Sequence, residues 1–324
     1  MNEESQIVPY QDQKLARIGL DCLPAAIVQA GPQAATRFIE FFTVTIRNKN
    51  TRAAYARAVR DFFDWCQARG LTLERIEPVA VAAYIEQHPG SAPTVKQHLA
   101  AVRMLFDWLV IGQIVRFNPA TSVRGPKHVV KKGKTPVLTA AEARELLEGI
   151  DTSHVVGLRD RALIAAMVYS FARVSAIAHM KVEDYYANGK RWWLRLHEKG
   201  GKFHEVPVHH KAEAYLDAYL VAAGIAGDKK TPLFRSTQGK TRRLSVRSMN
   251  RTDVLRMIKR RVKEAGLTDR ACCHTFRATG ITAYLEAGGT LEHAQAITAH
   301  ESPRTTKLYD RTSDQISLDE IERI

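Results

Sequence analysis

Cysteine is scarce in this sequence, and its spacing does not suit a metal site. The 324 residues include four cysteines, Cys22, Cys66, Cys272 and Cys273, and no C-x-x-C pair. Structural zinc sites take four tetrahedral ligands that commonly come in such pairs, and two adjacent thiols are a poor substitute. We therefore expect no bound metal, and reduced, mostly buried thiols as in a cytosolic protein.

Long apolar runs and recognisable phosphate loops are also missing. No segment has 18 uninterrupted apolar residues, the length that a membrane-spanning helix needs. The first residues, MNEESQIVPYQDQK, lack the cationic start and apolar run of a secretory signal. There is no Gly-rich phosphate loop with its lysine, and no carboxylate cluster that could hold magnesium. We expect a cytoplasmic protein with no cofactor and no membrane partner.

Positive charge is abundant and unevenly distributed. The chain has 48 Lys and Arg against 34 Asp and Glu, a net charge of +14. Residues 116–134 contain six Lys or Arg and no acid, and residues 231–264 contain eleven against two acids. A merely solvated surface is one interpretation of such charge. Its concentration in two segments favours a DNA-facing surface instead.

The first part of the chain is predicted to be a small helical domain. Residues 1–33 lack a strong period and are interpreted as a lead-in. Helical spacing then places Tyr55, Val59, Phe62 and Cys66 on one buried stripe of a helix for which we expect Thr51 as the N-cap and Gly70 as the C′ residue. A second helix over about 94–110 buries Val95, Leu99, Val102, Phe106 and Leu109, and shorter ones are expected near 34–47 and 77–87. Together they predict a helical DNA-binding domain over 34–115.

A basic linker over 116–137, broken by Pro and Gly, leads to a second domain over 138–324. Thr139 and Glu142 have capping-box spacing, and an apolar helical stretch follows that we expect to break near Ser170. Residues 191–208 alternate as a β-hairpin should, with a turn at Gly200-Gly201. The fold class predicted is mainly α with a small β-hairpin, in two domains.

Four residues near the C-terminus have the chemistry for attack on a phosphodiester. His274 and Arg277 stand three apart, which places them on one face of a helix, and His300 and Tyr309 follow. Cleavage without metal needs a nucleophile, cations for the charge on phosphorus and a proton donor. Arginine suits the charge role because its planar fork engages two phosphate oxygens, and histidine suits proton transfer. Each residue alone is a weak signal.

In order and spacing these residues resemble the tyrosine recombinase, or phage integrase, family. The family pattern is an arginine segment, a lysine in a hairpin turn, H-x-x-R, and a histidine followed nine residues later by tyrosine. This chain has SFARVSAI, EKGGK, HTFR and AHESPRTTKLY in that order. The matching residues are Arg173, Lys199, His274, Arg277, His300 and Tyr309.

The chain departs from the family pattern at three positions. Ala176 stands where the family has an acid three residues after the first arginine, and that acid helps to orient the active site. Phe171 and Ala299 stand where glycines are expected. Arg173 is therefore expected to be braced differently, or the activity to be low.

The resemblance implies a role for each matching residue. Tyr309 would attack the scissile phosphate and form a 3′-phosphotyrosyl link, while Arg173 and Arg277 would hold the non-bridging oxygens. Lys199 would protonate the leaving 5′ oxygen, His274 would accept or orient the tyrosine proton, and His300 would bond the phosphate. The reaction would need neither metal nor ATP, and strands would be exchanged through a Holliday junction.

The partners implied are double-stranded DNA with specific recombination sites and further copies of the chain. In the family a C-terminal helix docks into a neighbouring protomer. The tail RTSDQISLDEIERI has an apolar edge that would suit such docking in a homotetramer on synapsed DNA, although packing on its own domain is the alternative. Candidate DNA-binding residues are Arg52, Arg57, Arg60, Lys96, Arg103, Lys131, Lys132, Arg242, Arg243 and Arg247.

Two other functions remain open on the sequence. A type IB topoisomerase-like enzyme would share the chemistry without site preference, but the separate helical domain and the docking-type tail count against it. A DNA-binding regulator derived from a recombinase would bind without cutting, and Ala176 is the feature that favours it. Integration, excision, resolution and inversion are equally compatible with the residues, and so is any bacterial, phage or mobile-element host.

Overall fold

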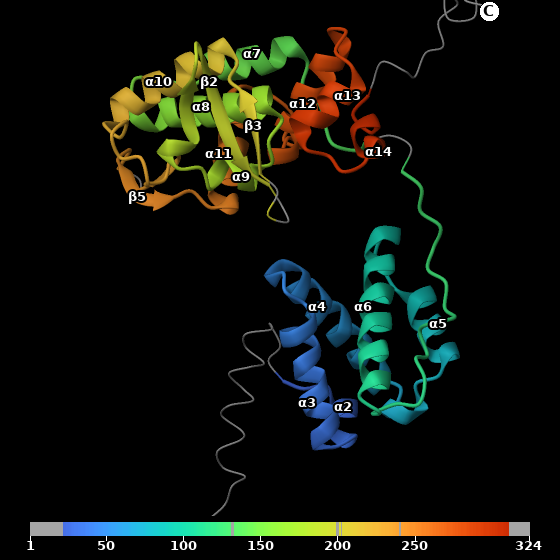
Figure 1. Ribbon diagram of the computed structural model, residues 1–324. Helices are drawn as coiled ribbons and strands as arrows, with labels where there is room; N and C mark the ends of the chain where they lie inside the picture. The colour runs from blue at the N-terminus through green and yellow to red at the C-terminus, as the bar shows by residue number, and fades with distance from the viewer. Residues whose placement is uncertain (1–21, 131–132, 199–200, 202, 240, 311–324) are drawn as a thin grey trace, which may run out of the picture. The chain divides into compact units, whose positions relative to one another are not determined.

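The computed structural model describes residues 22–130, 133–198, 201, 203–239 and 241–310, and it divides into two compact units (Figure 1). The first ends at Val129 and the second begins at Val130, which lies inside the basic segment that we interpreted as a linker. Each unit has its own hydrophobic core. Within the described residues, no helix is both long and apolar enough to cross a bilayer.

The first unit is entirely helical in its described part. The helices α4 (Lys49–Gln67) and α6 (Ala92–Ile111) pack against each other. The expected apolar stripe of α6 is buried throughout, and that of α4 is buried except at Tyr55, which is half-buried. The remaining elements are α2 (Ala25–Gln29), α3 (Pro32–Glu40), a π-helix η1 (Phe41–Thr45), a 3₁₀ turn η2 (Leu73–Arg75) and α5 (Pro78–Gln87).

The predicted N-cap of α4 is wrong, whereas Gly70 lies beyond the helix as expected. Its N-cap is Asn48, whose side-chain oxygen accepts hydrogen bonds from the backbone N–H groups of Asn50 and Thr51. Asparagine caps a helix at least as well as threonine, so the helix begins before Thr51. The helix ends at Gln67, and Gly70 lies beyond it with a left-handed φ of 65°.

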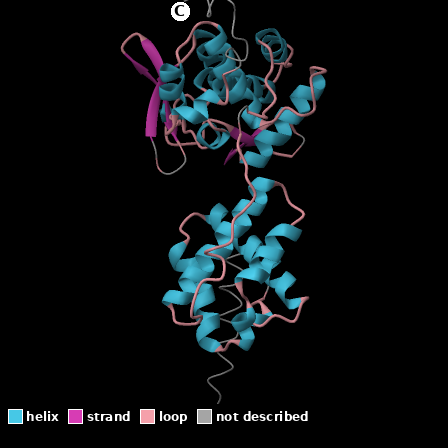
Figure 2. Cartoon of the chain, turned by 90° about the vertical axis from the view of Figure 1, so that its right-hand side faces the viewer, coloured by secondary structure: helices cyan, strands magenta, loops and turns pink. Residues whose placement is uncertain are grey.

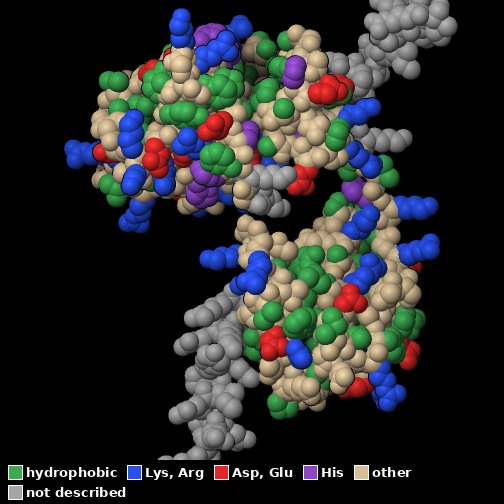
Figure 3. Space-filling model, viewed as in Figure 1, with side chains coloured by type: hydrophobic (Ala, Val, Ile, Leu, Met, Phe, Trp, Pro, Cys, Tyr) green, Lys and Arg blue, Asp and Glu red, His purple; other side chains and the backbone are tan. Residues whose placement is uncertain are grey.

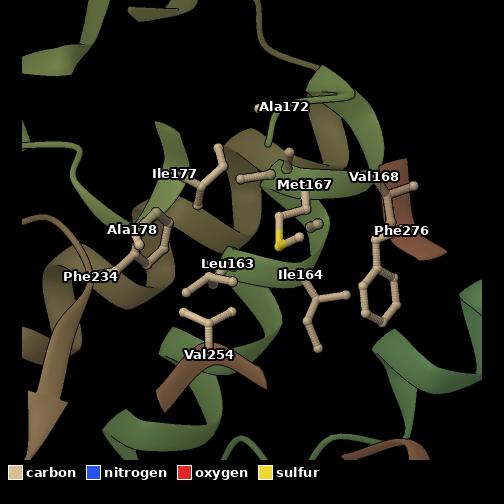
Figure 4. Packing of buried hydrophobic residues seen from close by; sticks show 14 of the residues in the cluster. Leu163, Ile164, Met167, Val168, Ala172, Ile177, Ala178, Phe234, Val254 and Phe276 are labelled. Atoms are coloured by element: carbon tan, nitrogen blue, oxygen red, sulfur yellow. The ribbon is translucent and has the colours of Figure 1, made fainter. Parts of the chain in front are cut away.

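The second unit is built around α8 (Val155–Ser170). Buried side chains of α8 meet others from α9 (Val174–Ala178), α11 (Arg251–Glu264) and α12 (Cys273–Glu286) in one core, as Figure 4 shows for Leu163, Ile177, Val254 and Phe276. Gly280 of α12 lies so close to α8 that a Cβ there would meet the Val168 carbonyl oxygen. The other helices are α7 (Ala140–Glu148), with the expected Thr139–Glu142 capping box, α10 (His210–Ala223), α13 (Leu291–Thr298) and α14 (Pro303–Lys307).

Two small antiparallel sheets lie apart in this unit (Figure 2). The predicted hairpin is present as β2 (Arg191–His197) and β3 (Phe203–Pro207), with Leu194 opposite Val206. The sequence analysis missed a third strand, β1 (Tyr185–Asn188), which follows the 3₁₀ turn η3 (Val182–Asp184), and a second pair, β4 (Arg235–Thr237) and β5 (Leu244–Ser248). These strands are too short to give a periodic pattern.

Two helices end at non-glycine residues with left-handed backbone. The break expected near Ser170 is at Phe171, which has φ 54° and ψ 20° after α8. Ala299 has φ 49° and ψ 43° after α13. These are the positions at which the family pattern has glycine, the residue that adopts this conformation most readily. Such a conformation costs about 1–2 kcal/mol for an L-residue.

Replacing Ala299 by glycine should therefore stabilise the second unit. The strain relieved is about 1–2 kcal/mol, and the extra entropy of glycine in the unfolded chain offsets part of it. We expect the thermal midpoint to rise by about 2–4 °C, which calorimetry measures. The matched control is Ala296→Gly, within α13 and exposed, which should lower the midpoint. A fall for Ala299→Gly as well would contradict the strain at Ala299.

Candidate active site

The turn between α8 and α9 presents the first arginine. The chain leaves α8 through the left-handed Phe171, and Arg173 is the N-cap residue of α9. The Arg173 guanidinium is half-buried, and its NH1 donates to Oε2 of Glu198 over 2.5 Å. The Arg173 backbone N–H also points to Oε1 of Glu198, at 3.4 Å. Arg173 is thus held from the β2–β3 hairpin.

Arg277 is buried at the centre of the site with 2% of its surface exposed. It projects from α12, where NH1 donates to the Phe171 carbonyl and NH2 donates to the Thr298 carbonyl over 2.9 Å. NH1 also lies 4.0 Å from Oε1 of Glu198. Burial, together with the neighbouring Arg173, lowers the pKa of Arg277 to about 10, so the guanidinium remains charged at neutral pH.

His300 completes the surroundings of Arg277 and has a defined tautomer. Its Nε2 lies 2.7 Å from Arg277 NH2, which can only donate, so Nε2 is the acceptor. Nδ1 therefore carries the proton and donates to Oγ1 of Thr306, a fully buried residue, over 2.9 Å. Burial and the cations Arg277 and Arg173 lower the pKa of His300 to about 3. The imidazole is neutral at every physiological pH.

Tyr309 lies against His300. The two rings are nearly parallel, at 11°, with centroids 5.9 Å apart. The Tyr309 backbone carbonyl accepts a hydrogen bond from the Thr282 hydroxyl of α12 over 3.0 Å. The Tyr309 side chain is half-buried, and its hydroxyl is close enough to bond Arg277 and raise the pKa of that arginine. The candidate nucleophile and the candidate phosphate-binding arginine are therefore neighbours.

His274 stands in the first turn of α12, one turn before Arg277, and is exposed. Its pKa is lowered because the ring loses part of its hydration and faces Arg277, Arg173 and Arg251. A groove of about 800 Å³ opens beside it, between the starts of α11 and α12. Arg251, Arg256 and Cys272 are among the groove's lining residues.

The structure brings together Arg173, His274, Arg277, His300 and Tyr309, as the family pattern predicts. Lys199 lies outside the described residues. Sequence reasoning missed Glu198 and Thr306. An acid directly before the lysine of EKGGK, in a chain that lacks the acid at position 176, was the available signal for Glu198. Nothing in the sequence singled out Thr306.

The candidate DNA-binding residues differ in their surroundings. Lys and Arg side chains project from both units on the face in Figure 3. Arg57, Arg60 and Lys96 are exposed in the first unit, whereas the guanidinium of Arg52 donates to the Ile46 carbonyl and that of Arg103 to the Ala120 and Val123 carbonyls. Arg242, Arg243 and Arg247 are exposed around the β4–β5 hairpin, and Lys131 and Lys132 lie outside the described residues.

Two expectations drawn from composition need correction. The basic segment 231–264 is not wholly a surface, because Arg260 and Arg261 both bond the fully buried carboxylate of Asp160 in α8. This network fastens α11 to α8. The cysteines are free, but only Cys66 is buried, and Cys22 is exposed. Helical spacing identified Cys66, whereas Cys272 and Cys273 lie at the partly open start of α12.

Comparison with known protein families shows which family the chain belongs to. Residues 136–315 match the phage integrase family, and residues 36–112 match the N-terminal SAM-like domain of phage integrases. The chain belongs to the phage integrase family. It is thus a tyrosine-type site-specific DNA recombinase. The tyrosine recombinase XerC of Pelobacter propionicus is 30% identical over 82% of this chain and 85% of its own, and that of Thermodesulfovibrio yellowstonii is 28% identical over 81% and 85%.

Solved recombinase structures share the fold of this integrase-family chain. XerH recombinase in a post-cleavage complex with palindromic difH substrate superposes with a TM-score of 0.71 at 20% identity, covering 97% of this chain and 88% of that one. A lambda integrase dimer bound to a COC′ core site gives 0.65 at 20% identity, over 87% and 79%. The mainly helical fold with small antiparallel sheets is therefore that of the family.

The neutral His300 should make stability depend on pH. The pKa of His300 in the folded chain, about 3, lies below the ordinary value of the unfolded chain. At a pH between these two values the unfolded chain therefore binds a proton that the folded chain does not bind. This contribution is complete above about pH 6.5 and is lost as the pH falls towards the folded pKa, at about 1 kcal/mol per pH unit. Denaturant unfolding between pH 7 and 5 measures it.

His300→Gln is the matched variant for this measurement, because glutamine keeps an acceptor for Arg277 and does not titrate. As the pH is lowered, its unfolding free energy should fall less steeply than that of the parent. The difference in slope should correspond to the binding of about one proton on unfolding. Equal slopes for the two proteins would show that His300 is not held neutral in the folded state.

Proposed function

We propose that this protein cuts and rejoins double-stranded DNA at specific sites through Tyr309. The observation that carries the proposal is the cluster of a tyrosine, a neutral histidine and a buried, charged arginine. The Tyr309 ring lies against His300, whose Nε2 bonds Arg277. A nucleophile beside a preorganised cation is what attack on a phosphodiester requires.

In the proposed reaction the Tyr309 oxygen attacks the scissile phosphorus, and the bond from phosphorus to the 5′ oxygen breaks. A 3′-phosphotyrosyl link and a free 5′ hydroxyl result. The tyrosine proton passes to His274, and Lys199 supplies the proton for the leaving oxygen. Rejoining reverses these steps, and the link conserves the bond energy, so no ATP is consumed.

The two arginines would stabilise the charge on the five-coordinate phosphorus. The fork of Arg277 is already fixed by two carbonyls and His300, so little reorganisation is needed when the phosphate arrives. Arg173 retains further N–H donors beside the bond to Glu198. His300 would contribute by fixing Arg277, because its Nδ1–H is engaged with Thr306 and its Nε2 has no proton to donate to the phosphate. The cations supplied by the protein support a reaction without metal.

The DNA backbone would follow the groove beside His274. The start of α11 contributes Arg251 and the N-terminal end of a helix dipole, which favour phosphate. The exposed Arg57, Arg60 and Lys96, and the β4–β5 arginines, are further phosphate contacts that we propose. In this view residues 34–115 form the core-binding domain, 116–137 the linker and 138–324 the catalytic domain.

We also propose that the chain works as a homotetramer on two synapsed DNA sites in the cytoplasm of its host. Among the similar structures is a lambda integrase tetramer bound to a Holliday junction. The tail over 311–324, whose apolar edge suggested docking into a neighbour, lies outside the described residues.

A covalent adduct to DNA tests the central step. In EDTA, with DNA from the gene's own neighbourhood and an SDS quench, the parent protein should give a protein–DNA adduct. Tyr309→Phe should give none, because phenylalanine has no oxygen to attack phosphorus. Binding of both proteins should weaken steeply with salt, since counterions are released from DNA.

Tyr284→Phe is the control for Tyr309→Phe. Tyr284 is another half-buried tyrosine of the same small apolar cluster, and its variant should form the adduct as the parent does. An adduct that persists in Tyr309→Phe would contradict the assignment of the nucleophile. Salt-sensitive binding with no adduct in the parent would favour the regulator.

A further inference from the structure

One buried carboxylate lies between the two arginines of the site. The Glu198 side chain has no exposed surface, and it follows the last residue of β2. Its Oε2 accepts from Arg173 NH1 at 2.5 Å, and its Oε1 lies 4.0 Å from Arg277 NH1. Glu198 raises the pKa of Arg277, against the effects of burial and of Arg173. The Glu198 carboxylate thus interacts with both guanidinium groups.

Among the described residues, Glu198 is the one acid that forms an ion pair with Arg173. Position 176, in the first turn of α9, holds an alanine with 1% of its surface exposed, packed in the main core of the unit. Two arginines so close repel each other, and a buried charge without a partner costs several kcal/mol. A carboxylate supplied by the hairpin removes both difficulties.

We propose that Glu198 is a positioning residue that fixes the forks of Arg173 and Arg277 for the phosphate and ties them to the hairpin that continues into Lys199. The proposal rests on the proposed function. One carboxylate therefore sets the orientation of both phosphate-binding arginines.

This role predicts a loss of rate rather than of affinity. Glu198→Gln keeps the size of the side chain but removes the charge that holds Arg173. Covalent adduct formation on a nicked suicide substrate should slow by about 100-fold, the cost of misplacing a catalytic group by about 1 Å. Affinity for the same DNA should not fall, since a negative charge beside the phosphate has been removed.

The matched control is Glu205→Gln. Glu205 is an acid on the adjacent strand β3 that pairs with Arg195 at 3.1 Å near the surface. Its removal should leave the rate of adduct formation unchanged. Glu198→Gln that reacts at the parent rate would overturn the proposal, and so would equal slowing by both variants.

Relocating the acid separates positioning from folding. Ala176→Glu added to Glu198→Gln returns a carboxylate to the neighbourhood of Arg173 from α9, so adduct formation should recover by about tenfold or more, as restored positioning requires. A carboxylate needed only to fold the hairpin would give no such recovery. A well-folded double variant that stays as slow as Glu198→Gln counts against positioning.

A double-mutant cycle of thermal unfolding measures the interaction between Arg173 and Glu198 without any DNA cleavage. Arg173→Ala and Glu198→Ala should each lower the unfolding midpoint, and the double variant should fall no further than the worse single one, because the two residues interact. If the losses of the unfolding midpoint are additive, Arg173 and Glu198 do not interact and the proposal is overturned. If the parent forms no adduct, the proposed function fails, and this cycle still decides whether Glu198 holds Arg173.

Discussion

The site depends on keeping one guanidinium charged and oriented inside the protein. Arg277 is enclosed, and a buried cation persists only if its donors find partners. Its partners come from three segments distant in sequence: the turn after α8, the residue after β2, and residues 298–300 at the end of α13. Arg277 therefore has its partners only when the helices and the hairpin of the second unit are assembled.

This requirement accounts for the two left-handed residues. Phe171 offers its own carbonyl to Arg277, and Ala299 lies between the Thr298 carbonyl and His300, both of which bond the same guanidinium. Each helix must end abruptly for these groups to turn towards Arg277. A cost of about 1–2 kcal/mol at each position is small beside that of an unsatisfied buried charge. Strain of this kind at a site is retained when the surroundings determine the backbone.

Local sequence signals predicted the elements with strong periods and the residues with a family pattern. The buried face of α6, the capping box at Thr139 and the β2–β3 hairpin follow from spacing alone, and Tyr309 was identified by its distance from His300. Although Glu198 stands directly before Lys199 in the sequence, spacing alone does not show that it is the acid that faces Arg173. It lies 25 positions away from Arg173, and only the assembled core brings α9 and the hairpin together. The hydrogen bonds from Arg260 and Arg261 to the buried Asp160 could not be predicted from the sequence for the same reason.

Arg277→Lys tests most directly whether a preorganised fork, rather than positive charge alone, makes this site. Lysine keeps the charge but cannot donate to two carbonyls, a histidine and a phosphate at once. The rate of adduct formation should fall by about 10²–10³-fold, as when one preorganised donor is lost, while the affinity for DNA changes little. A lysine variant that cleaves at the parent rate would contradict the account.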